Sequence, residues 1–184
     1  SNEDIQQIHI LKVPRRYALE TVSGNYTYCE DEPGLKLQLN NSDSSITYEL
    51  VKNDNNPVDT VARTADGSFE FNGYYREGTY SVYATTAAGC SDSMVNTVLL
   101  TENELPDPAP PISGDDTVTL NGSGSYSVAP IPNSASYVWD APDGATITGN
   151  GTRNITVSFT VGSPGVDSIS VYGENGCGVG DSSF

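Results

Sequence analysis

Basic residues are scarce in this chain. Its 184 residues include 8 Lys and Arg against 24 Asp and Glu, which gives a formal net charge of −16 at pH 7. A protein that binds nucleic acid or an anionic membrane surface needs a basic footprint, so this charge balance argues against both partners. The chain also has no apolar run of membrane-spanning length, so we expect no membrane insertion.

Catalytic motifs are equally scarce. The single histidine, His9, lies in an apolar run with no cysteine, serine or carboxylate at a spacing that would place it beside the imidazole. The sequence has no nucleophile elbow, zinc-ligand spacing, phosphate-binding loop or dinucleotide fingerprint. Asp140 and Asp143 resemble a glycosidase pair, but they share one short turn that implies no sugar-binding cleft. We therefore predict that the protein is not an enzyme.

The chain does show the alternation of apolar and polar residues that is typical of β-strands. From Ile155 to Val161, apolar residues alternate with hydroxyl residues, which places the apolar set on one face of a half-buried strand. Trp139 lies in a shorter strand before it, where the core between two sheets takes a large aromatic residue. The 18 Gly and 11 Pro suit a turn-rich β protein. The fold class predicted is all-β, with two tandem Ig-like β-sandwiches.

The same patterns divide the chain into four parts. Residues 1–16 contain an N-terminal extended strand that ends at Pro14, and residues 17–102 hold seven short strands with the spacing of an Ig-like sandwich. Residues 103–113 form a Pro-rich linker, expected to be a stiff spacer. Residues 114–184 form the second sandwich, with strands expected at 117–120, 126–129, 137–140, 146–148, 155–161 and 167–172.

The second sandwich also carries a family pattern, in the segments YVWDAPDGATI at 137–147, NITVSF at 154–159 and ISVYGENGCG at 169–178. This combination resembles the PKD-like, immunoglobulin-like repeats of Bacteroidota surface proteins, which occur in large type IX-secreted adhesins, including gliding-motility adhesins. The segment GTYSVYATTAAGC at 78–90 is similar to repeat modules of the same proteins. The resemblance implies an exported, cell-surface protein.

The chain contains three cysteines, Cys29, Cys90 and Cys177. Cys29 and Cys90 both lie in the first predicted domain, outside its periodic strands, and form the expected disulfide pair. In the resembled repeats, the cysteine equivalent to Cys177 pairs with a residue at about the position of Leu120. Since that position is leucine here, we expect Cys177 to be either a buried thiol, which is favoured, or an intermolecular one.

A mismatch between the chain ends suggests a mode of assembly. The resembled repeats have a final strand after the C-G-x-G turn, so we predict that domain 2 lacks its last strand. The apolar run at 5–13 looks like that strand and could be donated to domain 2 of the next molecule, through Ile5, Ile8, Ile10, Leu11 and Val13. Head-to-tail donation does not close on itself and builds a filament. A chain cut from a tandem array one strand out of phase would give the same mismatch.

The predicted function is therefore a structural or adhesive cell-surface protein, a filament or stalk subunit whose main partner is itself. The first alternative is a tandem-repeat fragment of a very long adhesin, with neighbouring repeats as partners. The second is a non-catalytic module that binds a surface glycan, with Tyr74 and Tyr75 as stacking residues; a protein ligand is the remaining partner considered.

Two further sets of side chains are candidates for ion binding or modification. No cofactor is expected apart from structural Ca²⁺, for which the oxygen-rich turns offer Asp54, Asp59, Asp115 and Asp116. The resemblance implies O-glycosylation at Asp-Ser/Thr followed by a small or aliphatic residue. The matching acceptors are Thr60, Ser93, Thr117 and Ser168.

Overall fold

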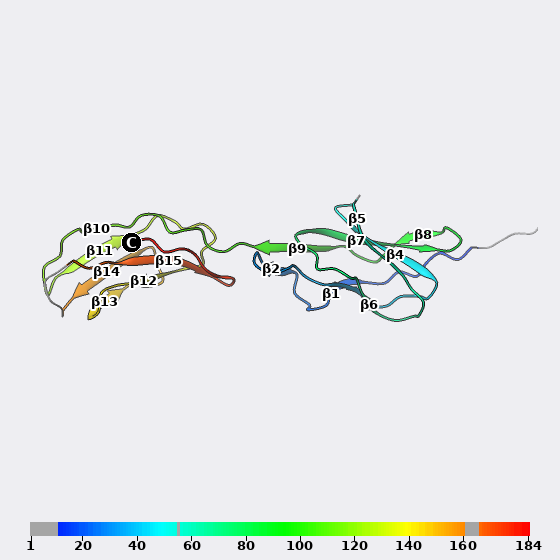
Figure 1. Cartoon of the computed structure of the whole chain (residues 1–184), viewed down its shortest axis with the longest axis horizontal. Coiled ribbons are helices and arrows are strands. Elements are labelled where there is room, and N and C mark those ends of the chain that lie inside the picture. The colour runs from blue at the N-terminus through cyan, green and yellow to red at the C-terminus, as the bar shows by residue number, and fades with distance from the viewer. Residues whose placement is uncertain (1–10, 55, 161–165) are drawn as a thin grey trace, which may run out of the picture. The chain divides into compact units, whose positions relative to one another are not determined.

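The computed structural model describes residues 11–54, 56–160 and 166–184. None of these residues is helical, and they form sixteen strands (Figure 1). The chain divides into two compact units, unit 1 at Ser1–Glu102 and unit 2 at Asn103–Phe184. The described residues contain no helix that is long and apolar enough to span a membrane. The predicted all-β class with two tandem sandwiches is confirmed.

Unit 1 consists of two sheets. The smaller has the order β1-β3-β6, and the larger has the order β2-β9-β7-β4-β5, with β8 paired to β7. Its strands are β1 (Leu19–Thr21), β2 (Thr27–Cys29), β3 (Leu37–Leu39), β4 (Ile46–Lys52), β5 (Asn56–Ala62), β6 (Phe69–Glu70), β7 (Gly78–Thr86), β8 (Ser91–Ser93) and β9 (Val98–Asn103).

The core of unit 1 follows the alternation in the sequence. Ile46, Tyr48 and Leu50 point inward from β4, while Leu37 and Leu39 do so from β3. Tyr48, Leu37, Leu39 and Leu50 are fully buried, as expected for residues two apart on strands that cover one core. The short strand β8 was not predicted from the sequence, because Ser91–Ser93 has no apolar alternation.

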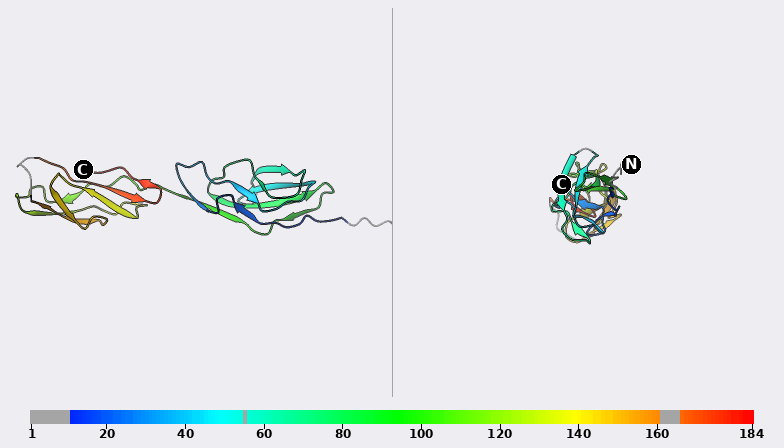
Figure 2. Two further views of the ribbon diagram at one scale, coloured as in Figure 1. Left: turned by 90° about the horizontal axis from the view of Figure 1, so that it is seen from below. Right: turned by 90° about the vertical axis from the view of Figure 1, so that its right-hand side faces the viewer.

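Unit 2 is a second sandwich of two antiparallel sheets, ordered β10-β11-β14-β13 and β12-β15-β16 (Figures 1 and 2). Its strands are β10 (Ser113–Gly114), β11 (Ser123–Ser127), β12 (Ser136–Asp140), β13 (Ala145–Thr148), β14 (Asn154–Phe159), β15 (Ser170–Asn175) and β16 (Gly178–Val179). The strand expected at 117–120 does not form, and β10 precedes that position instead.

The core of unit 2 is small and centred on Trp139. This side chain is 3% exposed and packs with Val171 from its own sheet and Ile155 and Val157 from the other. Its indole Nε1 donates a hydrogen bond to the carbonyl of Thr152 at 2.8 Å. A buried indole N–H needs such an acceptor, so the carbonyl fixes the orientation of the ring in the core.

The Pro-rich segment is not a free linker. Pro106 is buried and its Cβ lies about 3.0 Å from the position that a Cβ on Gly173 would take. The amide of Ala109 donates to the carbonyl of Asp181 at 2.9 Å, and the amide of Asp107 donates to that of Pro132 at 3.2 Å. Prolines leave few amide donors, but those of Asp107 and Ala109 pair with the rest of unit 2. The segment predicted as a spacer is therefore part of the second sandwich.

The edge of β15 was expected to lack a partner strand, but the C-terminal segment of the chain pairs with it. Residues Glu174 and Asn175 pair with β16, and Val171 exchanges two backbone hydrogen bonds with Ser183 at 3.0 and 2.9 Å. The chain after Cys177 thus turns back and runs antiparallel to β15. The pairing is short, but it covers part of the edge assigned to a missing strand.

Candidate functional site

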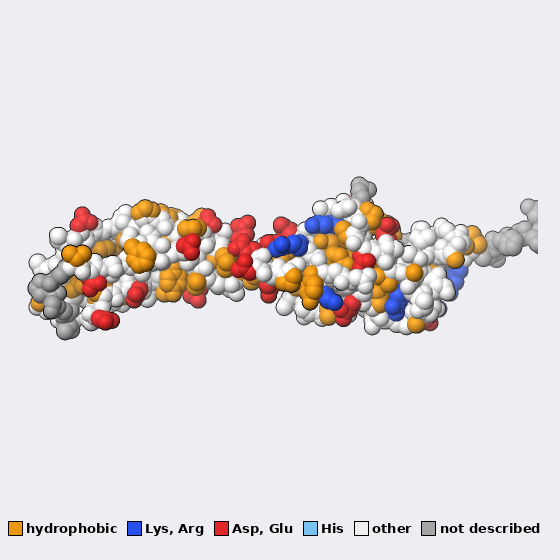
Figure 3. Space-filling view, viewed as in Figure 1, with side chains coloured by type: hydrophobic (Ala, Val, Ile, Leu, Met, Phe, Trp, Pro, Cys, Tyr) orange, Lys and Arg blue, Asp and Glu red, His pale blue; other side chains and the backbone are white. Residues whose placement is uncertain are grey.

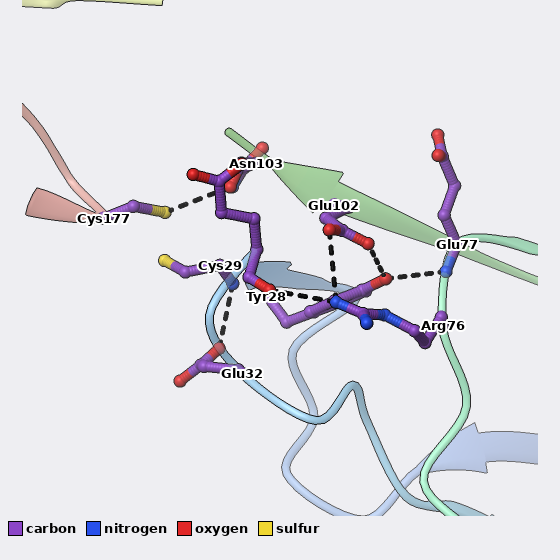
Figure 4. A network of polar contacts seen from close by, with 9 residues as sticks. Tyr28, Cys29, Glu32, Arg76, Glu77, Glu102, Asn103 and Cys177 are labelled. Atoms are coloured by element: carbon purple, nitrogen blue, oxygen red, sulfur yellow. Dashed lines mark hydrogen bonds and ion pairs between the residues drawn. The ribbon is translucent and has the colours of Figure 1, made fainter. Parts of the chain in front are cut away.

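A polar network joins three segments at one end of unit 1 (Figure 4). The hydroxyl of Tyr28, on β2, donates to Glu102 Oε2, on β9, at 2.6 Å. The same hydroxyl accepts the amide of Glu77 at 2.8 Å. Arg76 donates from Nη2 to the carbonyl of Glu30 at 2.9 Å and to Glu102 Oε1 at 3.3 Å. The partners come from three separate segments of the chain, around Tyr28, Arg76 and Glu102.

The central residue of this network, Tyr28, is buried. Tyr28 is 3% exposed, and burial, followed by the hydrogen bond to Glu102, raises the pKa of its phenol. The phenol therefore stays neutral and keeps its proton for Glu102. The ion pair of Arg76 and Glu102 is exposed on the arginine side and adds little by itself. Sequence periodicity could not reveal this network, because it depends on which strand ends meet.

The predicted Cys29–Cys90 disulfide is wrong. Cys90 is a free thiol, whereas Cys29 and Cys177 are both disulfide-bonded, so Cys29 is not paired with Cys90. The prediction that Cys177 is a thiol fails with it.

The geometry of unit 1 explains the error. Cys29 ends β2, beside β9, whose Leu100 pairs with Gly78 at the start of β7. Cys90 lies at the other end of β7, where its carbonyl accepts the amide of Thr86 at 2.9 Å. At about 3.3 Å per residue, β7 separates the two cysteines by on the order of 25 Å. A disulfide requires Cα atoms within about 7 Å.

Asp59, a calcium candidate, is already engaged by protein donors. Asp59 Oδ2 accepts the hydroxyl of Tyr75 at 2.8 Å and the amide of Asn72 at 2.7 Å. Although burial alone would raise the pKa of Asp59, the hydrogen bonds from Asn72, Tyr75 and Thr60 together lower it. The arrangement fits a structural carboxylate that holds strand β5 to the segment after β6.

The remaining calcium candidates are scattered. Asp54 lies in an exposed turn, and Asp115 accepts the amide of Ser125 at 3.1 Å through Oδ2, next to Asp116. Across the described residues, no three Asp, Glu, His or Cys side chains come together in a way that could hold a metal ion. Calcium binding stays a prediction.

Of the two tyrosines proposed for glycan stacking, Tyr74 is exposed and Tyr75 is buried. Tyr74 is 57% exposed, with the ammonium of Lys36 5.5 Å from its ring centre, while Tyr75 is 7% exposed and packs against Tyr80. Burial and the bond to Asp59 raise the pKa of Tyr75. A buried ring presents no face to a ligand, so Tyr74 alone is placed for stacking.

The modification candidates differ in accessibility. Thr60, Thr117 and Ser168 are exposed, and Ser93 is half-buried on β8. Three of the four acceptors are thus open to an enzyme that modifies the folded protein. Their modification stays a prediction.

The proposed donor strand is only partly described. Ile5, Ile8 and Ile10, together with His9, lie outside the described residues. Leu11 and Val13 are 56% and 58% exposed and belong to no strand. Two apolar side chains of the run are therefore in solvent.

Comparison with protein families identifies a PKD-like domain at residues 105–183. The match begins within the Pro-rich segment, in agreement with the packing of that segment on unit 2. No curated protein sequence matches the chain significantly.

Comparison with solved structures gives likenesses at low identity. Domains A168–A170 of titin align with a TM-score of 0.53 and 18% identity, over 90% of this chain and 63% of theirs. Murine CEACAM1b aligns at 0.44 with 12% identity, over 91% of this chain and 97% of that one. The BSP domain of a biofilm-associated protein aligns at 0.33 with 16% identity, over 90% and 28%. Of these three, the titin likeness alone exceeds a TM-score of 0.5, and it bears on the fold.

The class of protein follows from the fold and these matches. The chain is a tandem of Ig-like β-sandwiches whose second member contains a PKD-like domain. Ig-like and PKD-like folds are typically non-catalytic.

Proposed function

We propose that this protein is an extracellular structural or adhesive module that displays two stable sandwiches at a cell surface. The observation that carries the proposal is the disulfide-bonded state of Cys29 and Cys177 in an Ig-like, PKD-like chain. Structural disulfides persist in oxidising compartments and are rare in the cytosol. Small Ig-like sandwiches with few charged residues inside and polar loops outside commonly act as spacers or binding units.

Surface location has a direct test. Intact cells of the source organism would be treated with a membrane-impermeant amine label, and the protein would then be isolated. Labelling equal to that of a known surface protein supports the proposal. Labelling that requires cell lysis places the protein inside and contradicts it.

A second element of the proposal is head-to-tail assembly through the N-terminal run. Leu11 and Val13 favour it, because apolar side chains more than half exposed in an unpaired segment gain by entering a partner's sheet. Since residues 178–183 occupy part of the β15 edge, the donated strand must displace that short pairing or join another edge of unit 2, such as β13. A two-residue pairing such as that of β16 is easily displaced.

The assembly test uses point variants as well as truncation. Deletion of residues 1–13 and the double substitution Leu11→Asp with Val13→Asp should both abolish concentration-dependent oligomers in light scattering. Val95→Asp with Leu99→Asp is the matched control, because those residues are 59% and 61% exposed elsewhere in the described chain. Oligomers that survive both changes to the N-terminal run would refute strand donation.

A monomer at every concentration would favour the alternative, a repeat unit of a long adhesin. In that case the two sandwiches are neighbours in an array, and the ligand-binding part of the adhesin lies elsewhere in the long protein. The length of the gene separates the two possibilities, since a gene of thousands of residues fits an array and a short gene fits a self-assembling subunit.

O-glycosylation at Thr60, Thr117 and Ser168 would suit such a surface module, because all three hydroxyls are exposed. The intact mass of the protein from its native host should exceed the polypeptide mass by whole glycan units, and substitution of the three acceptors by alanine should remove the excess. A native mass equal to that of the bare polypeptide would contradict the proposal.

A further inference from the structure

The outer face of the larger sheet in unit 2 is made entirely of uncharged polar residues. Strand register puts Ser125 beside Thr156, and Thr156 beside Thr148, in one row across three strands. Rows above and below continue this pattern, because side chains two apart share a face. The face comprises Ser113, Ser123, Ser125, Ser127, Thr146, Thr148, Asn154, Thr156 and Ser158. We refer to it as the hydroxyl face.

Part of the hydroxyl face is hollowed. An open hollow of about 360 Å³ is lined by the side chains of this face, including Ser125, Thr148 and Thr156, together with Tyr126 and Ile155. The side chains of Tyr126 and Ile155 pack in the core, so these two residues reach the hollow through the backbone. The volume falls at the lower end of the range for small-molecule sites.

The polar groups around the hollow are available to a ligand. Ser127 donates its hydroxyl to the carbonyl of Ser113 at 3.4 Å. Within the described residues, the hydroxyls of Ser125, Thr148 and Thr156 make no hydrogen bond to the protein. Backbone groups of β14 pair with β11 on one side and with β13 on the other, so the centre of the face presents side chains. The hydroxyls are therefore the groups that a partner would meet.

The absence of charged residues from the hydroxyl face argues against a charged ligand. The hydroxyl face contains no Asp, Glu, Lys or Arg, although the chain carries a net charge of −16. Unit 2 has a single basic residue, Arg153, and on the side seen in Figure 3 all blue side chains lie on unit 1. Asp115 and Asp116 lie near Tyr126 and, after burial, raise its pKa. An anion would meet these carboxylates and find no cation, and a cation would find no carboxylate within the face.

We propose that the hydroxyl face of unit 2 binds a neutral oligosaccharide. Free hydroxyls lie at about 4.8 Å across strands and at about 6.8 Å along them, in a flat array of groups that both donate and accept. A neutral sugar chain carries the same kind of groups at its surface and pairs with them without a charge to compensate. A peptide strand would instead seek backbone groups at a sheet edge, which this face does not offer.

This inference names a ligand class for the adhesive role proposed above, and it is tested on the monomeric chain, so its failure leaves the assembly experiments unaffected. The unglycosylated protein, isotope-labelled, would be titrated with cello-, laminari-, manno- and malto-hexaose, and separately with oligogalacturonate as an acidic counterpart. Amide chemical shifts would map the contact, and calorimetry would give the affinity.

The proposal expects at least one neutral hexaose to shift the amides of β11, β13 and β14, while oligogalacturonate leaves them unchanged. Thr156→Val keeps the shape and strand propensity of the residue but removes one hydroxyl, and should weaken binding about fivefold. Thr97→Val, an exposed threonine of unit 1, is the matched control and should bind as the parent does. Unchanged thermal unfolding of both variants shows that they fold.

Three outcomes would overturn the proposal. One is the absence of shifts with every neutral hexaose. Another is a contact mapped elsewhere, for instance around Tyr74. The third is self-association through the face, seen as hydroxyl-face shifts that depend on protein concentration without any sugar; a second copy of the chain would then be the occupant.

Discussion

The hydroxyl of Tyr75 donates a hydrogen bond of 2.8 Å to Asp59 Oδ2. Asp59 lies on β5, the edge strand of the larger sheet of unit 1, and Tyr75 lies in the core between β6 and β7. The same carboxylate accepts the backbone and side-chain N–H groups of Asn72. An otherwise exposed edge strand is thereby fixed to the connection that follows the opposite sheet.

The lowered pKa of Asp59 predicts a pH dependence of stability. A carboxyl whose folded pKa lies below its unfolded value stabilises the folded state above the unfolded pKa, near 4, and this contribution is lost as the pH falls through the folded pKa. Asp59→Asn should lower the free energy of unfolding by about 1–2 kcal/mol at pH 7. Urea denaturation at pH 7, 4 and 2 should show the gap between parent and variant closing toward pH 2. A gap that stays constant would mean that the charge on Asp59 is not the source of the stabilisation.

Tyr28→Phe should destabilise unit 1. The change removes the acceptor of the Glu77 amide and the donor to Glu102, so a buried polar group loses its partner at a cost of about 1–3 kcal/mol. Tyr26→Phe, two residues earlier and 46% exposed, is the matched control and should change stability by less than about 0.5 kcal/mol. Chemical denaturation followed by tyrosine fluorescence provides the measurement. Equal stability of the two variants would show that the network contributes nothing.

Thiol chemistry should identify Cys90 alone. Alkylation of the unfolded, unreduced protein is expected to modify one cysteine, at position 90, and alkylation after reduction should modify three. Peptide mapping of the labelled protein locates the modified residue. A label on Cys29 or Cys177 without reductant would contradict the disulfide.

Trp139 offers a probe of unit 2, because it is the single tryptophan of the chain and lies in the core of that unit. Val157→Ala opens space beside it and should reduce the stability seen by tryptophan fluorescence by about 1–3 kcal/mol. Val179→Ala, at a site that is 54% exposed, should reduce it by less than about 0.5 kcal/mol. If the two variants unfold alike, the core contact of Val157 carries no measurable stability.

Many of the strands of each sandwich, and the side chains that face its core, could be predicted from the local alternation of apolar and polar residues. The alternation in Ile46–Leu50 and Ile155–Phe159 predicts which side chains point inward, since a strand places successive residues on opposite faces whatever it packs against. The PKD-like pattern around Trp139 also comes from contiguous segments, and the family match at 105–183 agrees with it. These features depend on neighbours in sequence.

The sequence by itself thus determined the class of fold and the inward faces of the long strands. It also determined the acidic net charge of the chain and the hydroxyl residues that alternate with the apolar ones in β14. Tertiary structure decided the rest. The position of Cys29 relative to Cys90 depends on which end of β7 lies beside β2 across β9, and the role of Asp59 depends on Tyr75 reaching it from the connection between β6 and β7. Pro106 likewise became part of unit 2 only by packing on it. Each of these relationships joins residues far apart in the chain, and pairing of strand ends, which no local pattern encodes, brings them together.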